Sequence, residues 1–491
     1  MPKLSRSRRS PPTAALVSLG CPKNLVDSER MLAGLALGGF VVAGDPDGAD
    51  VAVVNTCAFI DLARAESDRH LDGLEGLKRA GRLGRIVVAG CMAQRYGRRI
   101  LERHPGVDAV VGIADRGALA EVCKALLGTG AAPPPPGARA CTAAARPRAA
   151  GPHEALVRVG AHAGAPPDDR ERLRLTPRHY AYLRITEGCD NRCAYCAIPE
   201  IRGPLRTKPP GQVLAEAEEL VADGAKELIL IGQDTTAYGR DFAGSGWSLG
   251  RLLAELRTRV AVPWIRLMYT HPASFSDDVI DQLAAGPPVL PYADLPLQHA
   301  SDAILSSMGR RAGRAEIEDL IGRLRQAVPG IALRTSFIAG YPGETDEQFM
   351  ELLNFAKKVR FDHVGVFVYS REDGTRAAGL PGQVPADVAR RRWERLMAAA
   401  EGLARESACR RTGEVLEALV DGPDEMGRLV ARHAGQAPEV DSVVLLEPGA
   451  AKVGRFVEVR ITGGDGYDLV GKVIRADSRG GQPCSPRRTP R

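Results

Sequence analysis

The strongest constraint on the fold is a pattern that occurs three times near the amino terminus: an apolar run that ends at a cysteine. The runs precede Cys21, Cys57 and Cys91, and a segment with helical periodicity follows each of them. The cysteines are 36 and 34 residues apart, about the length of one strand-helix-strand unit. Because parallel strands bring their carboxyl ends to one edge of a sheet, the pattern predicts three thiols that meet at that edge. The alternative is three unrelated core cysteines, since free cysteine is often buried.

Length and changes of composition along the chain predict several domains and an α/β fold class. At 491 residues the chain is too long for one ordinary domain. A stretch rich in Pro, Ala and Gly interrupts the alternation of apolar and helical segments and is typical of a linker. We expect five parts: an α/β domain at 13–128, the linker at 129–172, a second domain at 173–407, a small β-domain at 408–477 and a disordered basic tail at 478–491.

Six apolar runs, separated by helical segments, occupy the second domain. They are YAYLRITEG, ELILIGQD, WIRLMYT, YADLPLQH, IALRTSFIAG and HVGVFVYS. Six such units in succession predict a parallel sheet curled into a partial (βα) barrel. After this domain, short alternating segments with glycine-containing turns predict a small antiparallel β-barrel.

The basic charge of the protein is concentrated at its two ends. The formal net charge is +6, yet the segments 1–12 and 478–491 carry eight Lys and Arg residues and no acid, which leaves the body near −2. A folded basic face is therefore not indicated. Ten cysteines are too few for a disulfide scaffold in so long a chain, and no apolar run reaches the length of a membrane span or a signal core. We expect a cytoplasmic protein.

Three further cysteines, Cys189, Cys193 and Cys196, follow the first apolar run of the second domain in the spacing C-x3-C-x2-C. A structural zinc site needs four ligands, and no second cysteine pair follows here. Three thiolates in one short loop suit an iron–sulfur cube in which one iron has no protein ligand and is open to a substrate. The loop also falls where barrel active sites lie, at the carboxyl end of a strand.

This motif, with Tyr195 immediately before its last cysteine, resembles that of the radical S-adenosylmethionine (SAM) superfamily. The resemblance implies that the open iron chelates SAM, and that one electron from the cluster cleaves SAM to a 5′-deoxyadenosyl radical. Polar residues at the carboxyl ends of the other strands, among them Gln233, would line the same end of the barrel as the cysteine loop. The segment FIAGYPGET is similar to the one near the adenosine, where Gly340 would let the backbone approach closely. A helix cap or a glycine turn is the alternative for these residues.

A three-cysteine α/β domain, a C-x3-C-x2-C barrel and a terminal β-barrel together resemble, over about residues 13–477, the methylthiotransferases. The resemblance implies that Cys21, Cys57 and Cys91 hold a second 4Fe-4S cluster, whose open iron can carry the sulfur to be inserted. We therefore expect two 4Fe-4S clusters, and SAM both as radical source and as methyl donor. Of the other four cysteines, Cys141 lies in the linker, and no ligand position of the family matches Cys123, Cys409 and Cys484.

Three segments resemble those of the branch of this family that modifies the β-carbon of an aspartate in small-subunit ribosomal protein twelve. They are SLGCPKNLVDSE, YCAIPEIRGPLRTK and GQDTTAYG. The terminal barrel resembles the TRAM module, which binds RNA in tRNA-modifying relatives. Residues 408–477, however, hold twelve acidic and nine basic side chains and so suit a basic protein better. The alternatives are a tRNA adenosine methylthiotransferase and a non-catalytic iron–sulfur scaffold or electron carrier.

The expected partners follow from this resemblance. They are ribosomal protein twelve, free or in the ribosome, together with an electron donor and a sulfur donor. We expect no membrane partner, and contact with nucleic acid only indirectly through the ribosome.

Overall fold

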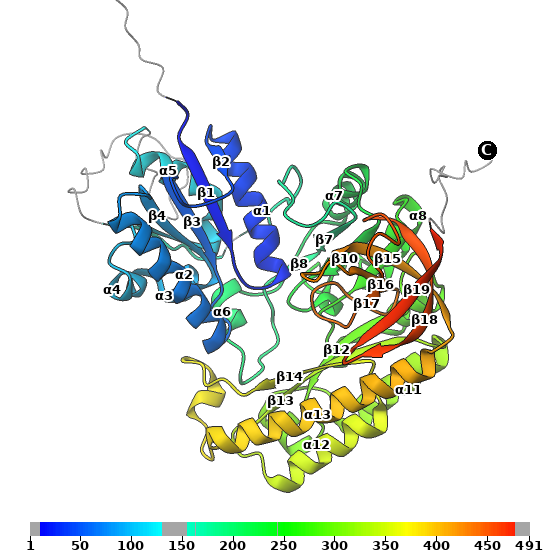
Figure 1. Cartoon of the computed structure of the whole chain (residues 1–491). Helices are drawn as coiled ribbons and strands as arrows, with labels where there is room; N and C mark the ends of the chain where they lie inside the picture. Colours follow the sequence, from blue (N-terminus) through cyan, green and yellow to red (C-terminus); the bar gives the residue numbers. More distant parts are fainter. Residues whose placement is uncertain (1–9, 130–154, 163, 243, 477–491) are drawn as a thin grey trace, which may run out of the picture. The chain divides into compact units, whose positions relative to one another are not determined.

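The structure is a computed structural model that describes residues 10–129, 155–162, 164–242 and 244–476 (Figure 1). The expected tail at 478–491 and two of the cysteines, Cys141 and Cys484, lie outside these ranges. Within the described ranges, no helix combines the length and the apolar character needed to cross a bilayer.

The chain divides into two compact units. Unit 1 extends to Gly164 and also takes in Asp169–Leu175 and Ala197–Gly203. Unit 2 holds Ala165–Asp168, Thr176–Cys196 and the chain from Pro204 onward. The three-cysteine domain is thus a unit of its own, whereas the six strand-helix units and the terminal β-domain pack together in the other.

Unit 1 is built on a six-stranded parallel sheet in the order β2-β1-β3-β4-β5-β6 (Figure 1). Its strands are β1 (Thr13–Ser18), β2 (Val41–Ala43), β3 (Val51–Thr56), β4 (Arg85–Gly90), β5 (Ala109–Gly112) and β6 (Leu156–Arg158). Its helices include α1 (Pro22–Leu37), α2 (Asp61–Arg79), α3 (Cys91–Tyr96), α4 (Ile100–Arg103) and α5 (Leu119–Leu126), with 3₁₀ turns at Gly97–Arg99 and Ile113–Ala118. This alternation confirms the predicted α/β class.

Residues of one strand belong to two separate hydrophobic clusters, because successive side chains point to opposite faces of the sheet. On β3, Val51 and Val53 pack with residues of α1 and α5, whereas Ala52 and Val54 pack with residues of α2, α3 and α4. All residues of β3 are buried. Helices on both faces explain why these strands are continuous apolar runs in the sequence.

Part of the expected linker at 129–172 is folded. Strand β6 lies inside it and extends the sheet by pairing in parallel with β5, Val157 opposite Val110. Farther along, Arg172 lies 2.9 Å from the carboxylate of Glu29 on α1, and the backbone N–H of Leu175 donates to the same carboxylate. Composition hides these contacts, because β6 has only three residues and the surrounding sequence is rich in proline and alanine.

The six predicted strand-helix units follow one another in unit 2. Their strands are β7 (Tyr180–Arg184), β10 (Glu227–Ile231), β11 (Trp264–Leu267), β12 (Tyr292–Gln298), β13 (Ala332–Ala339) and β14 (His363–Val368). They form two three-stranded parallel sheets, β11-β10-β7 and β12-β13-β14, with one parallel bridge between Ile265 and Val289 at the junction. This incomplete ring, which we call the core, is the predicted partial barrel.

Helices follow the core strands. They are α7 (Pro210–Ala222), α8 (Leu249–Arg259), α9 (Asp277–Ala284), α10 (Asp302–Ser307), α11 (Arg314–Ala327), α12 (Asp346–Val359) and α13 (Ala386–Arg411), with 3₁₀ turns at Thr235–Ala237, Pro272–Ser274 and Arg376–Gly379. Two short strands, β8 (Thr186–Glu187) and β9 (Arg206–Thr207), follow β7 in the chain and pair with each other. The short helix α6 (Ile198–Arg202) stands between them in the sequence and belongs to unit 1. Local chemistry sets some boundaries: the Thr345 hydroxyl accepts the N–H of Gln348, whose side chain accepts the N–H of Thr345, a capping box that starts α12.

The terminal barrel is a closed ring of five strands in the order β15-β16-β17-β19-β18. The strands are β15 (Val415–Pro423), β16 (Leu429–His433), β17 (Val444–Leu446), β18 (Phe456–Asp465) and β19 (Asp468–Ala476). Neighbours are antiparallel except β17 and β19, which are parallel. The barrel begins later than the expected residue 408, because α13 continues to Arg411 and carries the exposed Cys409.

This terminal barrel packs on the amino ends of the core strands. Glu227, the first residue of β10, is buried between two guanidinium groups, with Arg266 Nε at 2.6 Å and Arg432 Nη1 at 2.7 Å. Arg432 belongs to the barrel and also binds Asp421 at 2.6 Å. The contact lies at the end of the strands opposite the loop that carries Cys189.

Candidate active site

Cys21, Cys57 and Cys91, which we call the first triad, lie at the carboxyl ends of neighbouring parallel strands. β1 pairs with β3, and β3 pairs with β4. Cys57 directly follows β3, Cys91 directly follows β4, and Cys21 stands between β1 and α1. Cys57 and Cys91 are buried, and Cys21 is half-buried. The structure thus brings the three thiols to one edge of the sheet.

Asn24, in the first turn of α1, joins the three loops of the first triad. Its Nδ2 donates to the carbonyls of Leu19 at 3.0 Å and Thr56 at 2.9 Å. Its Oδ1 accepts from the Cys91 thiol at 3.3 Å. Asn24 is fully buried, so these bonds replace those it would make with water. No local sequence pattern marks this residue, because its partners come from three separate strand ends.

Two glycines let these loops approach one another. Gly20 has φ +92°, and a Cβ at this position would lie 2.8 Å from the Cβ of Cys57. Gly90 has φ +91°, and its Cβ would lie 2.2 Å from the Oδ1 of Asn55. A side chain at either position would both strain the backbone and push neighbouring strand ends apart.

The guanidinium group of Arg202 lies buried beside the first triad. Its Nη2 is 2.6 Å from Asn24 Oδ1, 3.0 Å from Asp27 Oδ2 and 3.5 Å from Cys91 Sγ. Arg202 is the last residue of α6, in a segment that packs in unit 1 although it starts immediately after Cys196 in the chain. A cation at this position favours the thiolate form, which is the form that binds metal.

Burial and charge act in opposite directions on the thiols of the first triad. Burial raises the pKa of Cys21, but the charges of Lys23 and Arg202, together with backbone N–H groups, outweigh it and place the pKa below its usual value. Burial raises the pKa of Cys91 to about 12, and it also raises the pKa of Cys57, to which the nearby Cys21 adds. In the metal-free protein Cys21 is therefore the first of the three to ionise.

The second triad, Cys189, Cys193 and Cys196, lies in one loop after β8. All three cysteines are half-buried. Within the loop, the backbone N–H of Ala194 donates to the carbonyl of Met308 at 2.8 Å. The three thiols are therefore brought together by their spacing within one loop, and a backbone hydrogen bond attaches this loop to the core.

Two polar side chains approach the second triad. Arg310 Nη1 donates to Cys193 Sγ at 3.8 Å. Asn191 Nδ2 lies 3.5 Å from Cys189 Sγ and 2.7 Å from the carboxylate of Asp234. Burial raises the pKa of Cys189 to about 11. Arg310 and Arg202 thus have corresponding places, each a guanidinium group beside one thiol of a triad.

Of the residues expected near SAM, Tyr195 and Gln233 lie at the carboxyl ends of the core strands. Tyr195 packs against an apolar cluster that contains Met308 and Tyr341, and burial raises the pKa of its hydroxyl well above the usual value. Gln233 follows β10, and its Nε2 lies 3.4 Å from the carboxylate of Glu187. Their binding of SAM stays a prediction.

Gly340, the third expected cofactor residue, has a packing role in the structure. It has φ +78°, and a Cβ there would lie 2.3 Å from the Cβ of Ala389 on α13. The glycine is therefore required by the close approach of a helix. This accounts for the residue without an adenosine, and its part in cofactor binding remains a prediction.

Buried polar atoms without partners lie at the carboxyl ends of the core strands. In the described part of the chain, Gln233 Oε1 beyond β10, His271 Nδ1 beyond β11, His299 Nε2 beyond β12 and the Tyr369 hydroxyl beyond β14 make no hydrogen bond. Burial, with nearby arginine charges, lowers the pKa of His271 to about 2 and that of His299 to about 3, so both imidazoles are neutral. Unmet hydrogen-bonding capacity of this kind is satisfied by a polar ligand. The strand ends therefore fit a ligand with several polar groups, as SAM is.

Two residues at the same strand ends adopt left-handed backbone conformations. Tyr269, beyond β11, has φ +58°, and Gln298, the last residue of β12, has φ +72°. Such conformations are costly for residues other than glycine and are concentrated at functional sites. Nothing in the sequence around Tyr269 indicates this conformation.

The donor sets of both triads fit an iron–sulfur cube with one open iron. Each triad offers three thiols, and the other described cysteines lie elsewhere. Cys123 is buried in the hydrophobic cluster of unit 1 that α5 shares with α1, and Cys409 is exposed on α13. Burial of the thiols and the adjacent guanidinium groups suit a cluster whose sulfur ligands are held away from water.

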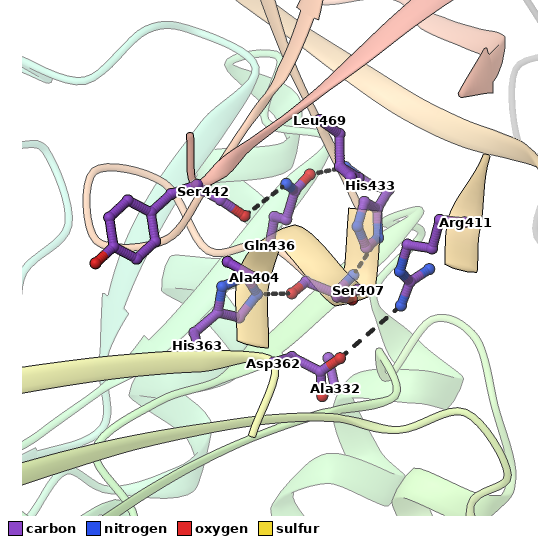
Figure 2. Close-up of a pocket in the computed structure, with 12 residues that line it drawn as sticks. Ala332, Asp362, His363, Ala404, Ser407, Arg411, His433, Gln436, Ser442 and Leu469 are labelled. Atoms are coloured by element: carbon purple, nitrogen blue, oxygen red, sulfur yellow. Dashed lines mark hydrogen bonds and ion pairs between the residues drawn. The ribbon is translucent and has the colours of Figure 1, made fainter. Parts of the chain in front are cut away.

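A pocket in unit 2 is separate from this site (Figure 2). Asp362, His363, Arg411 and His433 are among the residues that line it. His363 is the first residue of β14, so the pocket lies at the end of the core strands opposite the second triad. None of the six cysteines of the two triads lines this pocket.

Three family descriptions match the chain. Residues 13–112 match the Uncharacterized protein family UPF0004, residues 183–356 match the Radical SAM superfamily, and residues 412–474 match the TRAM domain. The first match contains the first triad, and the second match contains the second triad. Fold and site together define a radical SAM enzyme.

Comparison with individual proteins narrows this class. The chain is 40% identical over 470 residues to the ribosomal protein uS12 methylthiotransferase RimO of Desulfitobacterium hafniense (strain Y51), covering 94% of this chain and 98% of that protein. It is 43% identical over 464 residues to the same-named protein of Anaeromyxobacter sp. (strain Fw109-5), covering 94% and 93%. The chain belongs to the family of ribosomal protein uS12 methylthiotransferases.

A solved structure shares the fold at low sequence identity. It is the radical S-adenosylmethionine methyltransferase TsrM of Kitasatospora setae, with tryptophan substrate and a SAM analog bound. The TM-score is 0.51 at 15% identity, and the match covers 89% of this chain and 80% of that chain. At this identity the likeness shows the fold alone.

Proposed function

We propose that this enzyme attaches a methylthio group to the β-carbon of an aspartate in ribosomal protein uS12. The observation that carries the proposal is the presence of two separate three-thiol sets, one in each unit. Sulfur insertion at an unactivated carbon needs a radical to remove hydrogen and a sulfur source held within bonding distance, so two centres are required. Relatives that bear this name align with nearly the whole chain.

Each triad would hold one 4Fe-4S cluster, the second triad the radical-generating cluster and the first triad the auxiliary one. When bound, the clusters and SAM supply the radical that removes a hydrogen atom and the sulfur and methyl groups that replace it. Gln233, His271 and His299 would bind polar groups of SAM with their unpartnered atoms. Asn24 and Arg202 would hold Cys91 in place and favour thiolates in the first triad.

Two further partners are part of the proposal. Sulfur leaves with every product, so a sulfur donor must restore it, and an electron donor must reduce the cluster of the second triad before each cleavage of SAM. The substrate is uS12, free or within the ribosome, and nucleic acid is met only through the ribosome. The similarity to enzymes named for uS12 supports this choice.

Surface charge on the terminal barrel does not select the substrate. From residue 414 onward, the exposed charged residues of the described chain are balanced, five acidic and five basic. They are Glu414, Glu425, Glu439, Glu447 and Asp465, and Lys452, Arg455, Arg460, Lys472 and Arg475. Of the other acids counted in the sequence, Asp477 lies outside the described residues, and several are carboxylates bound within unit 2, such as Asp441, which pairs with Arg334 at 3.1 Å. The substrate proposal therefore does not rest on charge.

Mass spectrometry of small-subunit proteins tests the proposal directly. We expect uS12 from a deletion strain to lack one methylthio group, and the intact gene to restore it where variants of either triad do not. A deletion strain with unchanged uS12, but without methylthio-adenosine in its tRNA, would establish the tRNA alternative. Failure of the reconstituted protein to cleave SAM would favour a non-catalytic scaffold.

A further inference from the structure

Apart from the first triad, unit 1 contains a buried histidine, one of whose ring nitrogens has no hydrogen-bond partner. His104 directly follows α4, and its side chain is 4% exposed. Its Nε2 lies 3.0 Å from the carboxylate of Asp68 on α2, whereas its Nδ1 is buried and has no hydrogen-bond partner. A carboxylate at Nε2 keeps the proton on that nitrogen and leaves the lone pair of a neutral imidazole on Nδ1.

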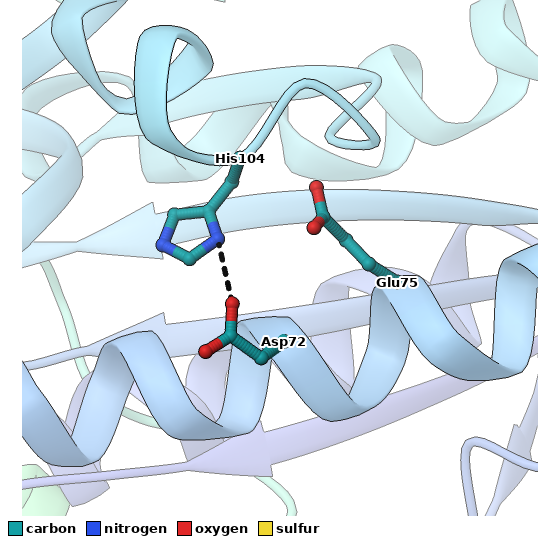
Figure 3. A group of neighbouring side chains, drawn as sticks. All are labelled: Asp72, Glu75 and His104. Atoms are coloured by element: carbon teal, nitrogen blue, oxygen red, sulfur yellow. Dashed lines mark ion pairs between the residues drawn. The ribbon is translucent and has the colours of Figure 1, made fainter.

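Two carboxylates lie near the ring of His104. Asp72 and Glu75 lie on α2, three residues apart and thus on the same face of the helix. An oxygen atom from each and one ring nitrogen of His104 all lie within 4.8 Å of one another (Figure 3). Asp72 Oδ1 is 3.5 Å from Nδ1, and Glu75 Oε1 accepts the backbone N–H of Gly106 at 2.7 Å.

We propose that His104, Asp72 and Glu75 bind a divalent transition-metal ion, for which Zn²⁺ is the probe. Imidazole nitrogen and carboxylate oxygen are both zinc ligands, and the nitrogen disfavours Mg²⁺ and Ca²⁺, which take oxygen ligands. The Nε2–H that His104 donates to Asp68 and the N–H that Gly106 donates to Glu75 are the outer contacts that orient metal ligands. Three protein ligands leave a fourth position for water.

The ion would clamp α2 to the loop after α4. These segments already meet through Lys78, whose Nζ donates to the carbonyl of Gly106 at 2.7 Å and pairs with Asp108 at 2.5 Å. On the same helix, the Ser67 hydroxyl donates to the carbonyl of Cys57 at 3.1 Å. A ligand that binds the folded form alone stabilises it, so Zn²⁺ should raise the unfolding temperature of the protein.

Zinc titration of the anaerobically reconstituted full chain tests the site. Calorimetry should show one saturable Zn²⁺ site, and X-ray absorption at the zinc edge should show nitrogen and oxygen neighbours without sulfur. The double variant Asp72→Asn, Glu75→Gln should bind Zn²⁺ at least tenfold more weakly. Asp72 is 69% exposed and Glu75 is half-buried, and Gln can still accept the N–H of Gly106, so the fold should be retained.

Glu66→Gln is the matched control, because it makes the same chemical change on α2 away from the three ligands. It should bind Zn²⁺ as the wild type does and gain the same rise in unfolding temperature. The proposal is overturned if the wild type shows no saturable site, if the double variant binds equally well, or if sulfur appears in the zinc shell. The group would then be an ion-pair cluster in which a protonated His104 lies between Asp68 and Asp72.

Discussion

The first triad takes its cysteines from three strand ends up to 70 residues apart, whereas the second takes them from eight consecutive residues. In the first, the register of the sheet places the thiols, and Asn24 joins their loops. In the second, the loop itself places them, and the core anchors its backbone. The first triad is thus a product of tertiary structure and the second of local sequence.

The guanidinium groups beside the triads differ in the same way. Arg202 is bound to the buried carboxylate of Asp27, whereas Arg310 donates to the backbone carbonyl of Pro296 at 2.6 Å. Loss of Arg202 would therefore leave a buried charge without one of its partners. Loss of Arg310 would leave the carbonyl of Pro296 and the Cys193 sulfur, which are cheaper to leave unpaired than a buried carboxylate. Loss of the adjacent arginine should therefore destabilise the protein more at the first triad than at the second.

Removing the second triad should have the largest effect. With Cys189, Cys193 and Cys196 changed to Ala, reductive cleavage of SAM should be abolished and iron content should fall from about eight to about four atoms per chain, since each cube holds four. Chromatographic assay of 5′-deoxyadenosine and iron analysis measure both. Cleavage at the wild-type rate would remove these residues from the radical site.

Removing the first triad should separate cleavage from product. With Cys21, Cys57 and Cys91 changed to Ala, 5′-deoxyadenosine should still form, while methylthiolated uS12 should be undetectable because the sulfur-carrying centre is lost. Iron should again fall to about half, as one cube of two is removed. Wild-type iron content together with normal product would return these cysteines to a structural role in the sheet.

Matched substitutions of the two arginines sharpen the comparison. Arg202→Met should lower the free energy of unfolding by about 2–3 kcal/mol, because it removes a charged hydrogen bond from a buried carboxylate, although Asp27 keeps Arg116 as a partner. Arg310→Met should cost about 1–2 kcal/mol, the value of a hydrogen bond to a carbonyl. Denaturant unfolding of the two iron-free variants gives both numbers, and equal costs would contradict the proposed difference.

The same pair should also differ in the cluster that each perturbs. A nearby cation stabilises the more negative, reduced cluster, so Arg202→Met should shift only the auxiliary cluster to a more negative potential, and Arg310→Met only the radical cluster. Redox titration followed by electron paramagnetic resonance resolves the two. A shift of both clusters in either variant would show that the arginines do not act locally.

A smaller loss of stability is expected at the junction of the core with the terminal barrel. Arg432→Met should cost about 2 kcal/mol, because it removes charged hydrogen bonds while Glu227 keeps Arg266 as a partner. Thermal unfolding should show the change in unit 2, with Lys452→Met, an exposed barrel change, as the control. Deleting the barrel outright would expose this buried junction and would destabilise the second triad's own unit, so it cannot isolate substrate capture.

Sequence alone could predict what depends on short spacing or on repetition. The loop of the second triad is recognisable because its thiols are adjacent in the chain, and the first triad because a strand ending at a cysteine recurs at nearly equal intervals. Asn24 and Arg202 could not be predicted, since their partners meet only through the fold. Strand β6 is too short to give a pattern.

The packing partner of a glycine is also not visible in the sequence. Gly340 suggested an approach to a cofactor, but the neighbour it accommodates in the structure is Ala389, nearly fifty residues away in the chain. Likewise, a count of charges in the terminal barrel could not separate exposed side chains from those bound to the core. In both cases the sequence gives the residue type without its three-dimensional neighbours.

The smallest effect expected is a difference in thiol reactivity in the iron-free protein. Alkylation requires the thiolate, so at pH 8 Cys21, with its lowered pKa, should be labelled first, ahead of Cys91 with a pKa of about 12 and Cys189 with a pKa of about 11. As pH rises, labelling of Cys21 should reach its plateau first, while that of the other two keeps increasing. Peptide mass spectrometry after short pulses of iodoacetamide gives the order. Arg202→Met should slow the alkylation of Cys21, because it removes one of the charges that lower the pKa of this thiol. Arg310→Met should leave the alkylation rate of Cys21 unchanged. Labelling of Cys91 before Cys21 would contradict the electrostatic asymmetry of the first triad.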